Sequence, residues 1–345
     1  MFKKLNSSKR LPLLITVGII IFISYGVIRG SILVHKTEKE LSPEKHIEEA
    51  ETKSYKLKEI DAITGDIRWE LTAEEGRTED NLQAATIKNI QAKVYKNMLV
   101  VFNLYAPQGK ANASTKEILL YGDVIANDAK KDFLLHSNQI SLGMGTSIEA
   151  QKGFNLVLKN TGTVIGESAL INEDQSKITV KKLKEAAFKD ILISGENVYI
   201  EKNEKGDLTK AIISDGGNII LKNKNNDVLN ANKIKWEKDK DIEASGNVIY
   251  TSQDKIFKAG YLLVKPNNKF YAKNNVVILH GETQCFGDSF SYENNSIITI
   301  TGNPKAVQES KQIFADKIVY NLDTNKLEAI GNVRTLVRDI KENNP

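Results

Sequence analysis

The chain has a single cysteine, Cys285, among its 345 residues. One cysteine excludes an internal disulfide framework and any zinc site built from several cysteines. The four histidines are also far apart, the nearest pair (His35 and His46) being separated by 11 positions, so no short metal-binding motif is present. These absences do not fix the compartment, because a chain without disulfides can fold on either side of a membrane.

A strong excess of charge of one sign is lacking as well. The sequence has 48 Lys and Arg residues against 44 Asp and Glu residues, a formal net charge of +4. Because this excess is small and scattered, we expect no nucleic acid among the partners. With 41% hydrophobic and 27% charged residues, the composition is that of a globular protein, long enough for one large all-β domain or two domains.

The signature motifs of common enzyme classes are absent. The sequence contains no G-x-S-x-G, no H-E-x-x-H and no glycine-rich phosphate loop after a strand pattern. We therefore predict a protein that is not an enzyme and has no catalytic residues, no cofactor and no metal site. A carbohydrate-active enzyme remains an alternative, because Asp and Glu are abundant, but it would need an exposed pair of carboxylates in a cleft.

The N-terminus combines basic residues with an apolar run. Four basic residues lie between positions 3 and 10, and residues 11–28 are uncharged. This 18-residue run would span ~27 Å as a helix, close to the membrane's hydrocarbon thickness of about 30 Å. The preceding basic residues favour a cytoplasmic N-terminus. We predict a cytoplasmic stub at 1–10 and a single transmembrane helix at 11–34, with a cleaved signal peptide as the alternative.

A charged stretch without aromatic residues follows the apolar run. We predict a linker at 35–53, with a short solvated helix from Pro43 to Glu51 because Ser-Pro at 42–43 favours a helix start. The functional part of the chain is then expected beyond this linker, outside the cytoplasm.

From Tyr55 onward, short runs of alternating apolar and polar residues are separated by Asn, Asp, Gly and Lys. Alternation with a period of two, cut by regular turn signals, is typical of β-strands and predicts an all-β body. The segment Val180–Asp190 is the exception, because Lys and Ala dominate it and a helix is compatible with its pattern.

A 28-residue repeat runs through the C-terminal third. Leu229, Phe257, Cys285 and Ile313 are each 28 positions apart, and the same step relates other sets of apolar residues. A Gly-Asn-Val-like corner closes each unit, as at 246–248. This pattern predicts stacked β units whose apolar residues form columns. The spacing of the columns that begin at 231 and 234 breaks strand parity, so we expect a bulge or bend in each unit.

Two reactive residue types fit this stack as ordinary structural residues. Cys285 occupies an apolar column, so it is predicted to be a buried small hydrophobe rather than a nucleophile. His280 ends a strand pattern and is interpreted as a turn-side residue.

The apolar columns allow two arrangements. They can line a groove that accepts an acyl chain, whose burial is worth about 0.8 kcal/mol per methylene, or they can fill a closed core. In either case a stack leaves open strand edges, which are capped or pair with another chain.

Several segments resemble known families. Residues 55–70 (YKLKEIDAITGDIRWE), 120–124 (LYGDV) and 135–142 (LHSNQISL) resemble the periplasmic domain of the LptC family, which anchors lipopolysaccharide export. Residues 244–251 (ASGNVIYT) and 327–333 (LEAIGNV) resemble the OstA-type repeats of the LptA family, its soluble bridge component. Anchor, strand order and repeats together extend the resemblance over about residues 11–337.

The resemblance implies a half-open, twisted β-jellyroll of stacked short antiparallel strands, whose cleft carries acyl chains. It assigns residues 54–190 to an LptC-like jellyroll and residues 191–345 to LptA/OstA-like repeats. The usual family pattern separates these parts, whereas this chain carries both. No catalytic residue is carried over. The inward strand positions of the family map onto candidate lipid-binding residues here. In the repeats they are Leu262, Phe290, Ile318, Trp236, Tyr292 and Tyr320, and in the first part Ile60, Trp69, Leu71, Val124 and Ile140.

The resulting prediction is a single-pass inner-membrane protein whose bulk is periplasmic. Its partners would be lipopolysaccharide, an inner-membrane ABC exporter contacted through the transmembrane helix, and a further jellyroll or outer-membrane component paired with the C-terminal edge near 313–333. The alternative is a membrane-tethered structural or adhesive β-solenoid that has a closed core and binds protein or cell-wall polymer on its outer face.

Overall fold

The computed structural model describes residues 51–78, 84–112, 114–129, 132–143, 147–222, 226–266, 269–294 and 296–337. Within these ranges every regular element is a β-strand, which confirms the all-β prediction. No helix in this part of the chain is long and apolar enough to cross a membrane. The predicted stub at 1–10, the anchor at 11–34 and residues 35–50 of the linker lie outside the described residues. The linker ends earlier than expected, because residues 51–53 already pair with β2.

The strands follow one another closely along the chain. They are β1 (Glu51–Ile60), β2 (Ile67–Thr78), β3 (Ala84–Lys96), β4 (Leu99–Asn112), β5 (Glu117–Asn127), β6 (Phe133–Leu142), β7 (Ile148–Leu158), β8 (Gly162–Ile171), β9 (Lys177–Phe188), β10 (Ile191–Lys202), β11 (Leu208–Leu221), β12 (Asp227–Ala231), β13 (Lys233–Glu237), β14 (Ile242–Ser252), β15 (Lys255–Val264), β16 (Phe270–His280), β17 (Thr283–Asn294), β18 (Ile297–Thr301), β19 (Lys305–Gln308), β20 (Lys311–Phe314), β21 (Lys317–Asn321), β22 (Lys326–Ile330) and β23 (Arg334–Val337).

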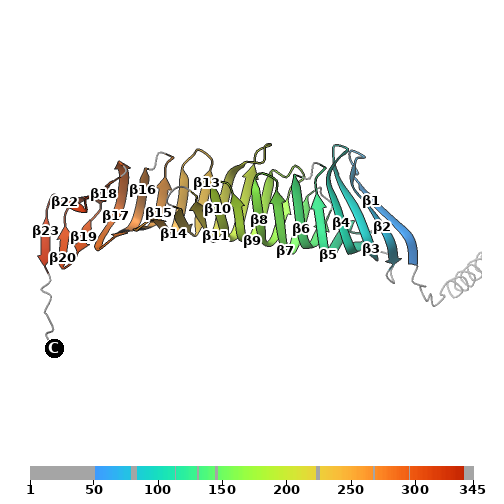
Figure 1. Ribbon diagram of the computed structural model, residues 1–345, viewed down its shortest axis with the longest axis horizontal. Coiled ribbons are helices and arrows are strands. Elements are labelled where there is room, and N and C mark those ends of the chain that lie inside the picture. The colour runs from blue at the N-terminus through green and yellow to red at the C-terminus, as the bar shows by residue number, and fades with distance from the viewer. Residues whose placement is uncertain are drawn as a thin grey trace, which may run out of the picture. The chain divides into compact units, whose positions relative to one another are not determined.

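All the pairings between these strands are antiparallel and most join sequence neighbours, so the strands follow one another from β1 to β23 (Figure 1). Strands β1 to β11 form an uninterrupted meander. The short strands β12 and β13 together act as one bent strand, because both pair with β11 on one side and β14 on the other. Near the C-terminus the sheet divides into two short branches, β18–β21–β22 and β19–β20–β23.

The helix that was compatible with Val180–Asp190 does not form, because this segment belongs to strand β9. Ile178, Val180 and Leu183 are buried on one side of the strand, and β9 pairs with both β8 and β10. The preference of Lys and Ala for a helix over most other residues amounts to a few tenths of a kcal/mol per residue. Two neighbouring strands and a buried face outweigh it.

The predicted bends are present in the middle of the long strands. In β14 the register shifts between Ser245 and Val248, where Gly246 and Asn247 adopt positive φ angles of 75° and 52°. The equivalent positions one unit later are Asn274 and Asn275, also with positive φ. Gly and Asn tolerate this left-handed conformation at lower cost than other residues. The Gly-Asn corners of the sequence repeat are therefore the bends of the structure.

Each bent strand folds back so that its two halves face each other. Tyr320 is in register, through β18 and β17, with Phe270 at the start of β16. His280 is the last residue of β16, so a straight strand would hold it roughly 30 Å from that register. The Tyr320 hydroxyl nevertheless lies 2.7 Å from His280 Nδ1. We call wall A the half-strands in register with Phe270–Lys273, and wall B those in register with Val276–His280.

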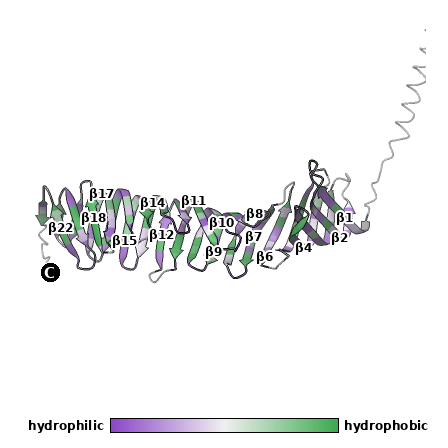
Figure 2. Cartoon of the chain, turned by 90° about the horizontal axis from the view of Figure 1, so that it is seen from above, coloured by the Kyte–Doolittle hydropathy of each residue, from purple (hydrophilic) through white to green (hydrophobic). Residues whose placement is uncertain are grey.

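The two walls enclose one continuous hydrophobic core. It extends from Trp69 to Leu322, and apolar residues alternate with polar ones along the strands (Figure 2). Hydrogen bonding continues across residue 190, where Leu192 of β10 pairs with Ala187 of β9, and residues 51–345 form one compact unit. The division into 54–190 and 191–345 concerns which family each part of the chain resembles, and it stays a prediction. It does not coincide with a break in the sheet.

Candidate functional site: the apolar interior and the mouth between its walls

One predicted column of lipid-binding residues lies on the inner side of wall A. Leu262, Phe290 and Ile318 are only 1–3% exposed. The sheet register connects them across the strands, from Leu262 to Ala272, Phe290, Ile300 and Ile318 in turn. The 28-residue period is therefore the spacing of every second strand of wall A.

The second predicted column lies two residues further along the strands of wall A, nearer to their ends. Tyr320 is fully buried, whereas Trp236 and Tyr292 are half-buried and pack against the core. Tyr292 is in register with Phe270 and Ile298, which are both buried. This column therefore lies at the outer limit of the interior, where the walls end.

In the first part of the chain, four of the five candidates are inside. Trp69, Leu71, Val124 and Ile140 are each 1% exposed or less. Ile60 is 39% exposed and lies outside the interior. Strand alternation explains this difference: Leu57 and Glu59 face inward opposite Leu71 and Trp69, so Ile60 faces outward, and the inward Glu59 pairs with Lys116 at 3.3 Å.

The interior is filled by side chains from both walls. Phe257 of wall B stacks on Phe290 of wall A with ring centroids 5.6 Å apart. Tyr250 of wall B lies 5.1 Å from Phe270 of wall A. The sequence left open whether the columns line a groove or fill a core. In this conformation the apolar side chains of the two walls are in contact.

Polar residues also join the walls, at the C-terminal side of the core. His280 Nδ1 lies 2.7 Å from the Tyr320 hydroxyl, and its Nε2 lies 3.2 Å from Asp254 Oδ2. The Tyr320 hydroxyl donates to Asn325 Oδ1 at 2.9 Å. His280 is the last residue of β16, beside the turn at 281–282 as expected, but it is only 8% exposed. It is a buried link between the walls.

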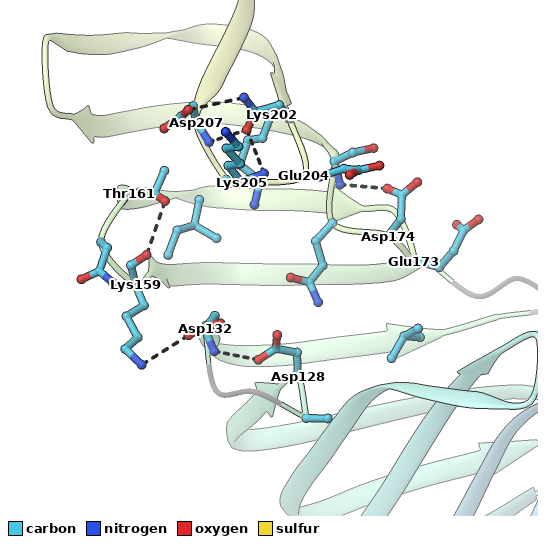
Figure 3. A pocket seen from close by; sticks show the side chains of 18 of the residues that line it. Asp128, Asp132, Lys159, Thr161, Glu173, Asp174, Lys202, Glu204, Lys205 and Asp207 are labelled. Atoms are coloured by element: carbon cyan, nitrogen blue, oxygen red, sulfur yellow. Dashed lines mark hydrogen bonds and ion pairs between the residues drawn. The ribbon is translucent and has the colours of Figure 1, made fainter.

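The strand ends of the two walls form two rows of turns, which we call rim A and rim B. Rim A includes residues 114–116, 172–176, 203–207 and 322–325, and rim B includes residues 97–98, 128–129, 132, 159–161 and 253–254. The space between the rims is the mouth of the fold. A hollow of about 930 Å³ lies there, lined by turns of both rims (Figure 3).

Polar contacts cross the mouth between described residues of the two rims. Lys96 at rim B pairs with Glu173 at rim A, with 3.1 Å between Nζ and Oε1. A Cβ atom placed on Gly206 of rim A would lie 2.8 Å from the Thr161 hydroxyl of rim B, so the turns touch there. Exposed ion pairs contribute at most about 1 kcal/mol each. An exposed ion pair such as that of Lys96 and Glu173 therefore opposes separation of the rims only weakly.

Charged groups of both signs surround the hollow at the mouth. Lys159 pairs with Asp132 at 3.4 Å on rim B. Burial lowers the pKa of Lys202, and the carboxylates of Asp128 on rim B and Asp174 on rim A partly oppose this shift. Within the described ranges, no group of three or more His, Cys, Asp or Glu residues is placed to hold a metal ion.

The two ends of the sheet are open edges. Among the described residues, β1 pairs only with β2, β22 only with β21, and β23 only with β20. The C-terminal edge also exposes apolar side chains, including Ile330, Leu336 and Val337 at 42–62%. An unpaired strand with exposed apolar residues is a template for pairing with another chain.

Comparisons with known proteins bear on the first part of the chain. Residues 18–148 match the family described as lipopolysaccharide-assembly, LptC-related. Similar solved structures include LptH of Pseudomonas aeruginosa, described as the LptA-homologous periplasmic component of the conserved lipopolysaccharide transport device. It is 13% identical, with a TM-score of 0.31, over 32% of this chain and 94% of LptH. No curated protein matches significantly. Over residues 18–148 the chain is thus similar to the LptC-related family of lipopolysaccharide-assembly proteins, as the resemblance in its sequence indicated.

Proposed function

We propose that this protein is a non-catalytic component of a lipopolysaccharide export bridge and carries acyl chains between walls A and B. The observation that carries this proposal is the single apolar core from Trp69 to Leu322, which runs through the family-matched segment and the repeats alike. The sugar part of the lipid stays outside the mouth, because the rims are polar and charged.

Loading requires the walls to separate, because their side chains are in contact. An acyl chain of a dozen carbons gains about 10 kcal/mol on burial, and it replaces contacts such as that between Phe257 and Phe290. A membrane offers the lipid a similar gain, so the interior alone gives no net driving force. The energy comes from a partner, an ATP-driven exporter in the inner membrane, contacted through the transmembrane helix proposed at 11–34.

The proposed arrangement places the bulk of the chain in the periplasm. The edge formed by β22 and β23 pairs with the next jellyroll or an outer-membrane component through main-chain hydrogen bonds. The exposed Ile330, Leu336 and Val337 support this choice of edge.

Site-specific photocrosslinking in living cells tests the proposal. A photoreactive residue replaces Leu262 or Phe290, which face inward, and matched probes replace the outward residues Lys238 and Lys258. We expect an adduct with the mass of lipopolysaccharide at the inward positions only. A folded protein that gives no lipid adduct at either inward position rejects the proposal.

A second candidate function is a membrane-tethered β-solenoid that binds protein or cell-wall polymer on its outer face. The packed interior favours it, because Phe257 and Phe290 already fill the space that a lipid would take. The same experiment separates the two functions, because the solenoid predicts adducts only at outward probes.

A further inference from the structure

The outer face of wall A has a hollow that the lipid-carrying function does not use. Its volume is about 410 Å³, and it lies over strands β15 to β18, on the side of the sheet opposite to the core. Its lining includes Tyr261, Tyr271, Lys273, Ser291 and Thr299. These side chains are outward neighbours of the buried columns, so they are not needed to close the interior.

The sheet register arranges the outward side chains in two rows that run across the strands. One row is Tyr261, Lys273, Ser289 and Thr301. The other row is Leu263, Tyr271, Ser291 and Thr299. Neighbouring strands are about 4.8 Å apart. A linear ligand lying along the first row would therefore meet a ring, an ammonium or a hydroxyl at every strand, and along the second row it would do so at every strand except β15, which presents Leu263.

Hydroxyl groups form the floor at one end of the hollow. Ser289 and Thr301 face each other on β17 and β18 with 2.9 Å between their oxygens, and Ser291 and Thr299 are the next pair in register. A hydroxyl both donates and accepts hydrogen bonds. Four of them in a square array suit a ligand that is itself rich in hydroxyls, and they make a poor surface for an acyl chain.

Aromatic rings with ammonium groups flank the other end. Lys273 Nζ lies 4.9 Å from the centre of the Tyr261 ring, and Lys265 Nζ lies 5.1 Å from the centre of the Tyr271 ring. Both tyrosines are half-buried. A tyrosine ring offers an apolar platform for the C–H face of a sugar. An ammonium beside it adds a partner for a carboxylate or phosphate.

The surface continues beyond Tyr261. A second hollow of about 200 Å³ shares this tyrosine and is lined by Ser214, Lys233, Lys235 and Ser245, together with the Glu243 carboxylate and apolar residues such as Ile212. Hydroxyls and lysines thus continue toward β13 and β11, with one carboxylate among them. The length of this surface favours a chain of several units over a single small molecule.

We propose that this outer face binds an oligosaccharide that carries acidic groups. Tyr261 and Tyr271 stack against sugar rings, the serine and threonine hydroxyls bond the sugar hydroxyls, and Lys265 and Lys273 pair with the acidic groups. This site is separate from the interior, so the proposal does not depend on the lipid-carrying function.

The test uses the full chain in detergent micelles and two matched probes, a galacturonic acid tetramer and its fully methyl-esterified form. Isothermal titration calorimetry measures binding. We expect the acidic tetramer to bind and the ester to bind about tenfold more weakly or not at all. The variants Tyr261→Ser and Tyr271→Ser each lose about tenfold in affinity, and Ser291→Trp, which fills the hollow, abolishes binding.

Phe286→Ser is the matched control. Phe286 is an outward, half-buried aromatic residue with Lys305 over its ring at 5.8 Å, but it lies on wall B, away from the hollow. This variant should bind as the unsubstituted chain does. The proposal is overturned if the acidic tetramer does not bind at millimolar concentration. It is also overturned if the ester binds equally well, or if the Tyr261, Tyr271 and Ser291 variants bind the tetramer as tightly as the unsubstituted chain does.

Discussion

At the scale of single residues, the walls are joined by a few side chains that are far apart in the sequence. Tyr320 is the clearest example. Its ring is fully buried within wall A, and its hydroxyl bonds His280 of wall B and Asn325 of rim A. A single oxygen atom therefore connects both walls and a turn.

Replacing Tyr320 by Phe tests this connection. The change removes the hydroxyl and leaves His280 Nδ1 buried without that partner, so we expect a loss of about 1–3 kcal/mol. Because a stack of strands can open locally, the loss should appear in the amide hydrogen exchange of β16 and β21 and much less in β5. Tyr271→Phe, which removes an exposed hydroxyl, is the control and should change stability by less than about 0.5 kcal/mol. Equal effects of the two variants would contradict this role of Tyr320.

Cys285 gives a prediction about pH. Burial raises the pKa of its thiol to about 12 from an ordinary value of 9.0. The folded protein keeps the thiol proton to higher pH than the unfolded chain does. This contribution to stability is therefore complete below pH 9.0 and is lost as the pH rises toward about 12.

The thiol of Cys285 should accordingly resist a thiol-specific reagent at pH 8 in the native protein and react fully in urea, because the thiolate is the reactive form. Fast reaction of the native protein would show that the core around Cys285 is open.

At the scale of strands, the bends decide how the chain folds. Gly246 has a φ angle of 75°, and a Cβ atom there would lie 2.9 Å from the Asn232 side chain. Asn247 beside it also has a positive φ, 52°, but carries a side chain. In β14 the first position of the bend therefore favours glycine for space as well as for conformation.

We expect Gly246→Val to destabilise the protein by at least about 1–2 kcal/mol, because a β-branched residue is strained in the left-handed region. Asn247→Gly keeps the conformation accessible and should be nearly neutral. Thermal unfolding of the two variants compares them directly. A neutral Gly246→Val would mean that the bend does not depend on this residue.

Strand-scale features were largely predictable, and their limits have physical causes. The 28-residue period identified the columns of Leu262 and Phe290 because inward positions of a regular sheet recur at fixed spacing. Strand β9 was ambiguous because its pairing with β8 and β10 outweighs its local propensity. Ile60 was misplaced in the interior because the inward position at the end of β1 is taken by the charged Glu59, which an apolar pattern does not identify. The link from His280 to Tyr320 is set by the folding of the strands, which no local pattern records.

At the scale of the whole described unit, the account depends on the mouth opening. If acyl chains travel inside while the sugars stay outside, the part of the lipid that joins them must move along the mouth between the rims. A covalent bridge across the mouth would then stop the lipid at that point. Thr161 and Gly206 suit such a bridge, because a Cβ atom on Gly206 would lie 3.9 Å from that of Thr161, within the range found in disulfides.

The most direct measurement combines this bridge with photocrosslinking in cells. The variant carries Thr161→Cys and Gly206→Cys, with a probe either at Ile140, before the bridge, or at Leu262, beyond it. The control carries Thr161→Ser and Gly206→Ser. With the disulfide formed, we expect the lipopolysaccharide adduct to persist at Ile140 and to disappear at Leu262, and a reductant should restore it there. An unchanged adduct at Leu262 under oxidising conditions, with the disulfide verified by mass spectrometry, would contradict passage of lipid along the mouth between walls A and B.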